Sequence, residues 1–271
     1  MGSTRFDFES TLFSSEWYDK ENDQLKPGAP EEIQKEFSRY CSWAMAVDIV
    51  LCIEMTKYMS DFIYMLKENA MKLCDDIIAQ MKNRYNGKLI YIREFRIKVI
   101  IFRNCSYDDY YATLAESKFF EIPKETDGFR ACIESIQPDY DAYNDYANGY
   151  EAIGCAIRSE WNKNSVGRKR HVIVVCTGNE AYGLGLMSPV YYPEGMPKDF
   201  DELSREWGSK SQPGIMDERA KRLLLFAAPG VMANWRRLSD NWDNVIFYET
   251  ESSPWFELDY NLLIHDITHS G

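Results

Sequence analysis

The residues best suited to chemistry follow a short apolar run near position 50. Glu54 and Thr56 come directly after the sequence VDIVLCI, which starts at Val47, and Tyr58 follows two positions later. A carboxylate and a hydroxyl at the end of a buried strand lie where open α/β sheets bind their ligands. Oxygen groups of this kind can bind a hard divalent cation, accept a proton or contact a partner.

Two further groups of polar residues have comparable positions. Thr177, Gly178 and Asn179 follow the apolar run HVIVVC, and the polar stretch 139–146 precedes a helical pattern and contains Tyr143, Asn144 and Asp145. Loops after neighbouring parallel strands meet at one edge of a sheet. We therefore expect these two groups to converge with Glu54, Thr56 and Tyr58 on one candidate site.

The elements that must position this site alternate along the chain. Short β-branched runs predict buried strands at 47–53, 96–102, 171–176, 222–227 and 245–248, with a short edge strand at 119–122. Apolar residues at three- and four-residue steps predict helices at 59–81, 129–136, 147–161, 200–207, 231–242 and 260–268. This alternation predicts a doubly wound, mostly parallel six-stranded sheet with helices on both faces and one short antiparallel edge strand.

The chain divides near position 44. Residues 1–44 are mostly polar and contain the breaker KPGAP at 26–30, which indicates an N-terminal arm or cap. Residues 45–271 form the predicted α/β domain. A segment rich in Gly, Pro and Tyr at about 179–216 is expected to be an insertion in it.

Several stretches together resemble the von Willebrand factor A (VWA) domain, and more closely bacterial VWA proteins. They are residues 48–59, 99–104, 129–133, 147–153, 156–161, 170–179 and 196–203. The resemblance covers roughly residues 45–268. It implies a VWA-like fold with a metal-ion-dependent adhesion site, built from an Asp-x-Ser-x-Ser motif, a Thr or Asp in a middle loop and an Asp after the fourth strand.

This chain departs from that motif at each of its parts. Glu54, Thr56 and Tyr58 stand where the family has Asp and two hydroxyl residues, the middle-loop position falls at Asn144 or Asp145, and Gly178 replaces the last Asp. Mg²⁺ requires near-octahedral oxygen ligands at about 2.1 Å, so a longer carboxylate and a rigid phenol disturb its coordination. We expect a degenerate site with no metal and no cofactor. The alternative is a working Mg²⁺ site formed by Glu54, Thr56 and Asp145.

The function predicted from these residues is a non-catalytic protein-interaction module that binds a protein partner through the loops at the strand ends. The resemblance implies an adaptor or scaffold in a multi-protein bacterial system. Tyrosines that can contribute to a recognition face cluster in or near these loops; they are Tyr58, Tyr110, Tyr111, Tyr140, Tyr143, Tyr146, Tyr150, Tyr182, Tyr191 and Tyr192.

A hydrolase or a nucleotide-binding enzyme is a weaker alternative. Glu54 has no nucleophile or histidine beside it in its motif, and no phosphate-binding glycine motif follows the first strand. His171 opens a buried strand, where we expect it to anchor the strand end.

Composition excludes other partners. The net charge of −12 disfavours nucleic acid and anionic membranes, and no run of about 18 apolar residues occurs. The seven cysteines form no CxxC pair, and we expect them to be reduced thiols of a cytoplasmic protein.

Overall fold

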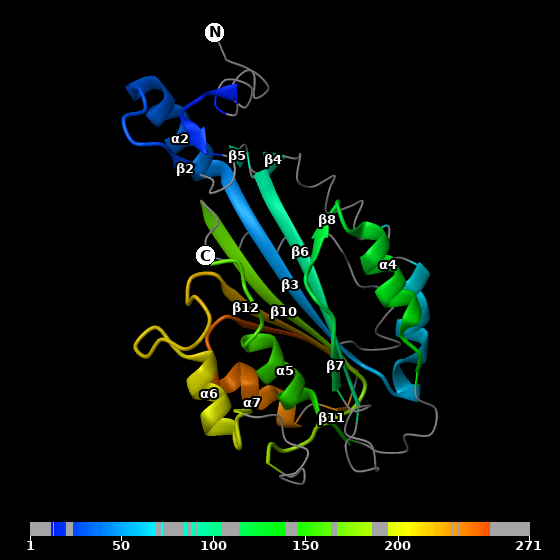
Figure 1. The fold of residues 1–271 in the computed structure, drawn as a ribbon. Helices are drawn as coiled ribbons and strands as arrows, with labels where there is room; N and C mark the ends of the chain where they lie inside the picture. The colour runs from blue at the N-terminus through cyan, green and yellow to red at the C-terminus, as the bar shows by residue number, and fades with distance from the viewer. Residues whose placement is uncertain are drawn as a thin grey trace.

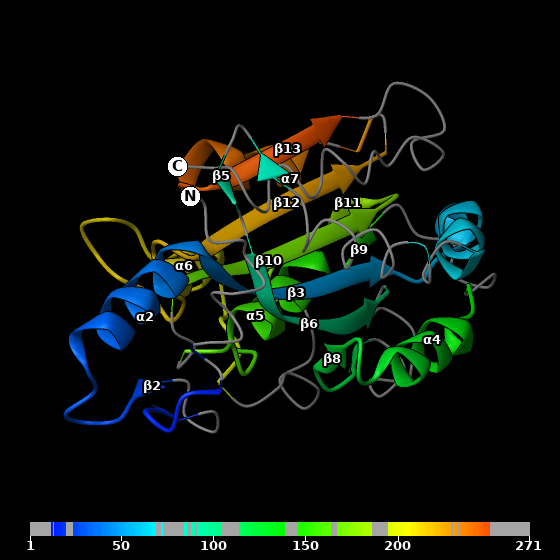
Figure 2. The same cartoon turned by 90° about the horizontal axis from the view of Figure 1, so that it is seen from above.

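The computed structural model describes residues 12, 14–19, 24–68, 72, 84–85, 88–89, 91–103, 114–138, 146–163, 167–185, 195–228, 230–231 and 233–249. Its main sheet contains β3 (Ala44–Glu54), β6 (Tyr91–Phe102), β7 (Leu114–Glu116), β8 (Phe120–Ile122), β10 (Arg168–Thr177), β12 (Lys221–Ala227) and β13 (Val245–Glu249). The strands follow the order β13-β12-β10-β3-β6-β7, and β8 also pairs with β6 (Figure 2).

The sheet is mostly parallel, as predicted. The four junctions from β13 to β6 are parallel, whereas β7 and β8 both run antiparallel to β6 at the outer edge. The doubly wound fold is therefore confirmed. The edge differs in detail, because two short antiparallel segments share the outer side of β6 where the sequence predicts one.

Strand β3 is central, as expected for the first strand of such a sheet. It lies between β6 and β10, and all of its residues are buried. A strand covered on both faces needs apolar side chains pointing both ways, which explains the unbroken apolar run from Ile49 to Ile53. Its last residue, Glu54, therefore lies inside the protein.

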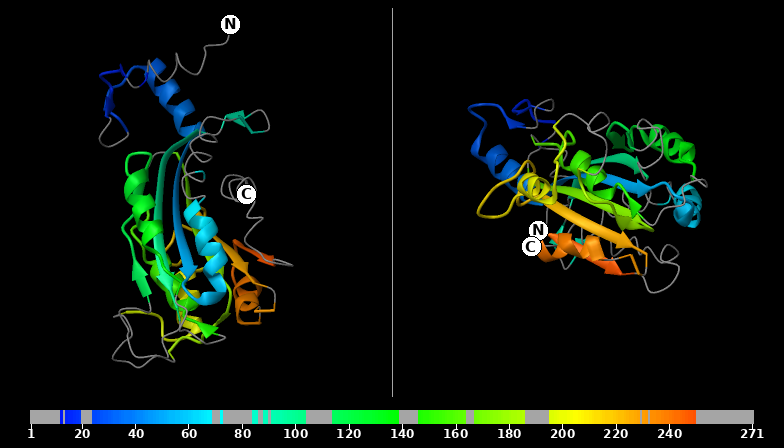
Figure 3. Two further views of the ribbon diagram at one scale, coloured as in Figure 1. Left: turned by 90° about the vertical axis from the view of Figure 1, so that its right-hand side faces the viewer. Right: turned by 90° about the horizontal axis from the view of Figure 1, so that it is seen from below.

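Helices cover both faces of the sheet (Figures 1 and 3). On one face, the 3-10 turn η1 (Lys57–Met59), a helix at 60–68 and α4 (Thr126–Ser135) pack in a core cluster with Ile49, Leu51, Ile97 and Val174. On the other face, α5 (Gly149–Ile157), α6 (Phe200–Trp207) and α7 (Ala233–Asn241) pack on Val50, Ile173 and Leu223. Both predicted helical layers are therefore present.

The predicted helix limits are correct for α6 and too wide for α5. Helix α6 begins after Asp199, whose side chain accepts a hydrogen bond from the Glu202 N–H over 2.8 Å. Helix α5 ends at Ile157 and not at Trp161, because the Trp161 indole turns back and donates to the Ile157 carbonyl over 3.1 Å. The helix predicted at 260–268 and most of the one predicted beyond residue 68 lie outside the described residues.

The N-terminal part forms its own small cluster. Helix α2 (Glu31–Trp43) leads directly into β3, and it packs with the hairpin of β1 (Tyr18–Asp19) and β2 (Gln24–Leu25) beyond the end of the sheet where β3 begins (Figure 1). This cluster contains buried Leu12, Tyr18 and Tyr40. The other short pairs are β4 (Arg84–Tyr85) with β5 (Lys88–Leu89), and β9 (Tyr146–Ala147) with β11 (Glu180–Ala181).

Ionisable residues form one row across the sheet. Strand register aligns Arg96, Asp48, His171 and Lys221 on β6, β3, β10 and β12 in turn. The Arg96 guanidinium donates two hydrogen bonds to the Asp48 carboxylate, over 2.8 and 2.6 Å. The Asn162 N–H donates to the same carboxylate over 2.6 Å. These contacts satisfy the charge of Asp48, which is 1% exposed.

His171 lies beside Asp48 in this row and anchors the beginning of β10. Its imidazole stacks on the Trp161 ring at 5.1 Å, and its Nε2 donates to the Asn162 carbonyl over 3.1 Å. Burial lowers the pKa of His171 from 6.5, and the Asp48 carboxylate opposes part of that shift. The folded protein therefore favours the neutral imidazole.

A pH dependence of stability follows from this lowered pKa. As the pH falls below 6.5, His171 takes up a proton in the unfolded chain before it does so in the folded chain. The contribution of His171 to the free energy of unfolding therefore declines as the pH falls towards the folded pKa. We expect the stability difference between the wild type and His171→Gln to be constant above about pH 7.5. At lower pH the wild type should lose stability relative to the variant, by at most about 1.4 kcal/mol per pH unit. Urea unfolding from pH 5 to 8 measures this difference. A pH-independent difference would show that His171 titrates alike in both states.

Candidate functional site

The carboxyl ends of β3 and β10 bring most of the predicted site residues together. Because the two strands are parallel neighbours, with Cys176 opposite Ile53, Glu54 and Thr177 end side by side. Glu54, Thr56, Thr177 and Asn179 are all buried there. Tyr58 and Gly178 belong to the same two loops, whereas Tyr143, Asn144 and Asp145 lie outside the described residues.

The first oxygen of the Glu54 carboxylate, Oε1, accepts two hydrogen bonds from side chains. The Thr56 hydroxyl donates to it over 2.5 Å, and the Asn179 side-chain amide donates to it over 2.5 Å. The Asn179 amide nitrogen also lies 3.4 Å from the Thr56 hydroxyl oxygen. The Asn179 amide thus lies between the Glu54 carboxylate and the Thr56 hydroxyl, the first two oxygen groups of the candidate site.

The second oxygen, Oε2, accepts three hydrogen bonds from the loop after β10. The Thr177 hydroxyl donates over 2.6 Å, and the backbone N–H groups of Gly178 and Asn179 donate over 2.9 and 3.0 Å. An ionised carboxylate offers about four lone-pair sites. Five donors therefore use all of the acceptor capacity of Glu54.

The electrostatics of Glu54 combine two opposing effects. Burial raises the pKa of its carboxyl from 4.5, while the hydrogen bonds from Thr177, Thr56 and the two backbone N–H groups lower it. Glu54 is 0% exposed. An isolated carboxylate at such a depth would be very costly, so the five donors are what makes its burial possible.

The other two motif positions, Tyr58 and Gly178, supply no side-chain oxygen that faces the carboxylate of Glu54. The Tyr58 side chain is 51% exposed, and the Lys57 ammonium lies 5.1 Å from the centre of its ring. A Cβ atom at Gly178 would lie 3.2 Å from both Tyr58 Cβ and Met59 Sδ. A carboxylate side chain at position 178 would therefore crowd Tyr58 and Met59, which would have to shift by a few tenths of an ångström to accommodate it.

Hydrogen bonds to α7 stabilise the loop after β10. The Glu180 carboxylate accepts hydrogen bonds from the N–H groups of Ala233 and Asn234, over 2.9 and 3.1 Å. The Trp235 indole donates to the Asn179 carbonyl over 2.8 Å. Sequence reasoning missed this support, because more than fifty positions separate Glu180 and Asn179 from α7 and no local pattern joins them.

The described residues do not fit the cation that the fold resemblance implies. The carboxylate of Glu54 is saturated, the phenol of Tyr58 is directed outward, and position 178 has no oxygen ligand. Among the residues that the structure describes, no group of three or more His, Cys, Asp and Glu side chains could hold a metal ion. The arrangement instead stabilises two loops against each other.

Exposed aromatic residues lie on the loops beside this site. Tyr146 is 45% exposed and contacts Tyr182 edge to face, with ring centres 5.8 Å apart, and Tyr58 lies beside Gly178. Tyr150 was predicted to belong to the same face, but this is wrong. Its ring is buried against Phe200 and Trp235, and its hydroxyl donates to the Asn234 carbonyl over 2.5 Å. The remaining tyrosines named above lie outside the described residues.

No protein-family model matches the chain, and no curated protein matches it either. Solved structures with a similar fold include the pilus adhesin SpaC from Lactobacillus rhamnosus GG, with a TM-score of 0.49 and 13% identity over 82% of this chain and 30% of that chain. Proximal thread matrix protein 1 from the mussel byssus, whose MIDAS motif is occupied by zinc, has a TM-score of 0.43 and 12% identity over 83% and 48% of the two chains.

The SpRpn10 VWA domain has a TM-score of 0.40 and 10% identity, over 77% of this chain and 90% of that one. The chain thus spans less than a third of SpaC and about half of the thread matrix protein. The strand order of the chain itself has β3 at the centre and two antiparallel segments at the edge beside β6. The chain has the doubly wound, mostly parallel α/β fold that its sequence predicts.

Proposed function

We propose that this protein is a non-catalytic interaction module, an adaptor or scaffold that docks a protein partner on the loops at the carboxyl ends of β3 and β10. The observation that carries the proposal is the exposure of Tyr58 and Tyr146 around a buried, fully hydrogen-bonded Glu54. We call the surface formed by Tyr58, Tyr146 and Tyr182 the tyrosine rim. Its loops are held firmly and its outer side chains are aromatic.

Aromatic side chains on a rigid support suit protein recognition. Tyrosine contributes a large contact area at a low cost in conformational entropy, and its hydroxyl can hydrogen-bond to a partner. Binding residues are commonly placed on loops that a rigid scaffold positions. The backbone under the tyrosine rim meets this condition, because the carboxylates of Glu54 and Glu180 hold it.

An enzymatic role has less support. The five hydrogen-bonding partners of Glu54 are hydroxyls and amides of Thr56, Thr177, Gly178 and Asn179. None of these groups accepts a proton readily, and all of them hold the carboxylate away from solvent. A general base needs a substrate proton within hydrogen-bond reach. The buried position of Glu54 therefore favours a structural role within the docking loops.

Affinity capture from the source organism tests the tyrosine rim. We expect Tyr58→Ala and Tyr146→Ala each to reduce recovery of the same partner by about tenfold or more, because central aromatic residues dominate many interfaces. Ile215→Ala is the matched control, since Ile215 is 41% exposed and lies just before β12, towards the opposite ends of the strands. If both tyrosine variants capture the partner as the wild type does, the proposed docking surface is wrong.

A further inference from the structure

We infer that the Asn179 side-chain amide takes the place of the cation at this site, so that the two docking loops are joined by a neutral donor of the chain itself. The fold resemblance assigns a cation to the position between the first two motif residues, which here are Glu54 and Thr56. The Asn179 Nδ2 atom lies 2.5 Å from Glu54 Oε1 and 3.4 Å from Thr56 Oγ1.

The chemistry of the amide matches that role in part. A side-chain NH₂ group carries two hydrogens with partial positive charge, so it can face two oxygen acceptors at once. It carries no net charge and needs no additional ligands. Because Asn179 also donates its backbone N–H to Glu54 over 3.0 Å, one residue contacts both oxygens of the carboxylate. A cation between Glu54 and Thr56 would have to displace the Asn179 amide from Glu54 Oε1.

The turn at Gly178 supports the inference independently. The glycine allows its backbone N–H to approach Glu54 to 2.9 Å, while Tyr58 and Met59 occupy the space beside its α-carbon. A carboxylate at position 178, which would help to hold a cation and its waters, is absent from this chain, and a side chain there would crowd Tyr58 and Met59. The missing carboxylate at position 178 and the Asn179 amide therefore both act against cation binding at Glu54.

The inference deepens the proposed function, on which it rests for the use of these loops in docking. It adds that docking at the tyrosine rim does not depend on divalent cations. Its test measures cation binding and stability alone, without the partner. A failure of the capture experiment and a failure of this inference can therefore be told apart.

The first measurement uses the wild-type protein. We expect titration calorimetry with Mn²⁺ and with Mg²⁺ to show no saturable binding. A ligand that binds only the folded state raises the melting temperature, so we expect the melting temperature to be the same in EDTA and in an excess of either ion. A one-site isotherm that Glu54→Gln abolishes would overturn the inference.

The second measurement restores an anionic ligand. Asn179→Asp places a carboxylate against Glu54, so we expect a lower melting temperature in EDTA and a rise of at least about 4 °C on addition of Mn²⁺. Thr177→Val is the control, because it also removes a donor from Glu54 but adds no oxygen. It should be destabilised without responding to Mn²⁺. If Asn179→Asp responds no more than this control, the amide does not occupy a cation position. Should Asn179→Asp fail to fold, the wild-type titration decides.

Discussion

Replacing Glu54 with Gln is expected to lower the free energy of unfolding by about 3 kcal/mol or more. The substitution keeps the shape of the side chain but turns one acceptor into an NH₂ group that faces existing donors. The hydroxyls of Thr56 and Thr177 and the amides of Gly178 and Asn179 converge on this position, and it is fully buried. Each buried donor that loses its acceptor costs about 1–3 kcal/mol. Urea unfolding measures the loss.

Glu121→Gln is the matched control for this prediction. Glu121 also accepts a hydrogen bond, from the Lys124 ammonium over 2.6 Å, but its side chain is 44% exposed and that of Lys124 is 72% exposed. Water replaces such a contact when it is lost, so we expect no measurable change in stability. A Glu54→Gln variant as stable as the Glu121→Gln control would contradict the view that the five donors depend on this carboxylate.

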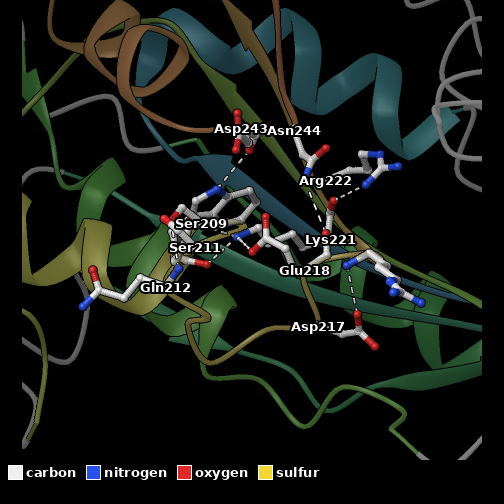
Figure 4. Close-up of polar contacts among 12 residues, drawn as sticks. Ser209, Ser211, Gln212, Asp217, Glu218, Lys221, Arg222, Asp243 and Asn244 are labelled. Atoms are coloured by element: carbon white, nitrogen blue, oxygen red, sulfur yellow. Dashed lines mark hydrogen bonds and ion pairs between the residues drawn. The ribbon is translucent and has the colours of Figure 1, made fainter.

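The second large effect is expected at Lys221, at the opposite end of the sheet from the candidate site. Its ammonium donates to the carbonyls of Trp207 and Gly208, over 2.6 and 3.0 Å, and to the Glu218 carboxylate over 2.5 Å (Figure 4). The Lys221 side chain is 0% exposed, and burial lowers its pKa while Glu218 opposes that shift. The contacts hold the end of α6 against the start of β12.

Lys221→Met is expected to cost about 3 kcal/mol, because it leaves two carbonyls and a largely buried carboxylate without their donor. Chemical denaturation of the variant and of Lys124→Met measures the difference. Lys124 makes the same kind of ion pair, with Glu121, on the surface. A loss at Lys221 that is no larger than the loss at Lys124 would mean that the buried ammonium contributes nothing beyond its desolvation cost. Adding Glu218→Gln to Lys221→Met should recover part of the stability, since it removes the unpaired charge.

Much of the fold could be predicted from the sequence because the central strands are buried on both faces. Runs such as VDIVLCI and HVIVVC are short, apolar and bounded by polar residues, and they became β3 and the apolar part of β10. Helix α2 was not predicted. Its sequence is strongly polar, yet Ile33, Phe37 and Tyr40 recur at helical spacing and all contribute to the N-terminal cluster. The polar residues between them obscured that pattern.

The candidate site was predictable in position and not in its internal contacts. Parallel strands bring their carboxyl ends together, which places Glu54 beside Thr177 from topology alone. The hydrogen bond between Asn179 and Glu54 joins residues 125 positions apart and depends on the rotamers of both side chains. The support of Asn179 by Trp235 likewise depends on the packing of α7. Such contacts have no local sequence pattern.

In the described part of the chain, no helix combines the length and the apolar character needed to cross a bilayer. The cysteines there are free thiols; those of Cys52 and Cys176 are buried, and burial raises the pKa of both.

The most direct test of the central claim is a high-resolution crystal structure grown with Mn²⁺, with anomalous difference density calculated around Glu54. The five-donor arrangement predicts no anomalous peak there and an Asn179 amide within hydrogen-bonding distance of the Glu54 carboxylate. A peak about 2.1–2.2 Å from a Glu54 oxygen, with the Asn179 side chain displaced, would contradict it.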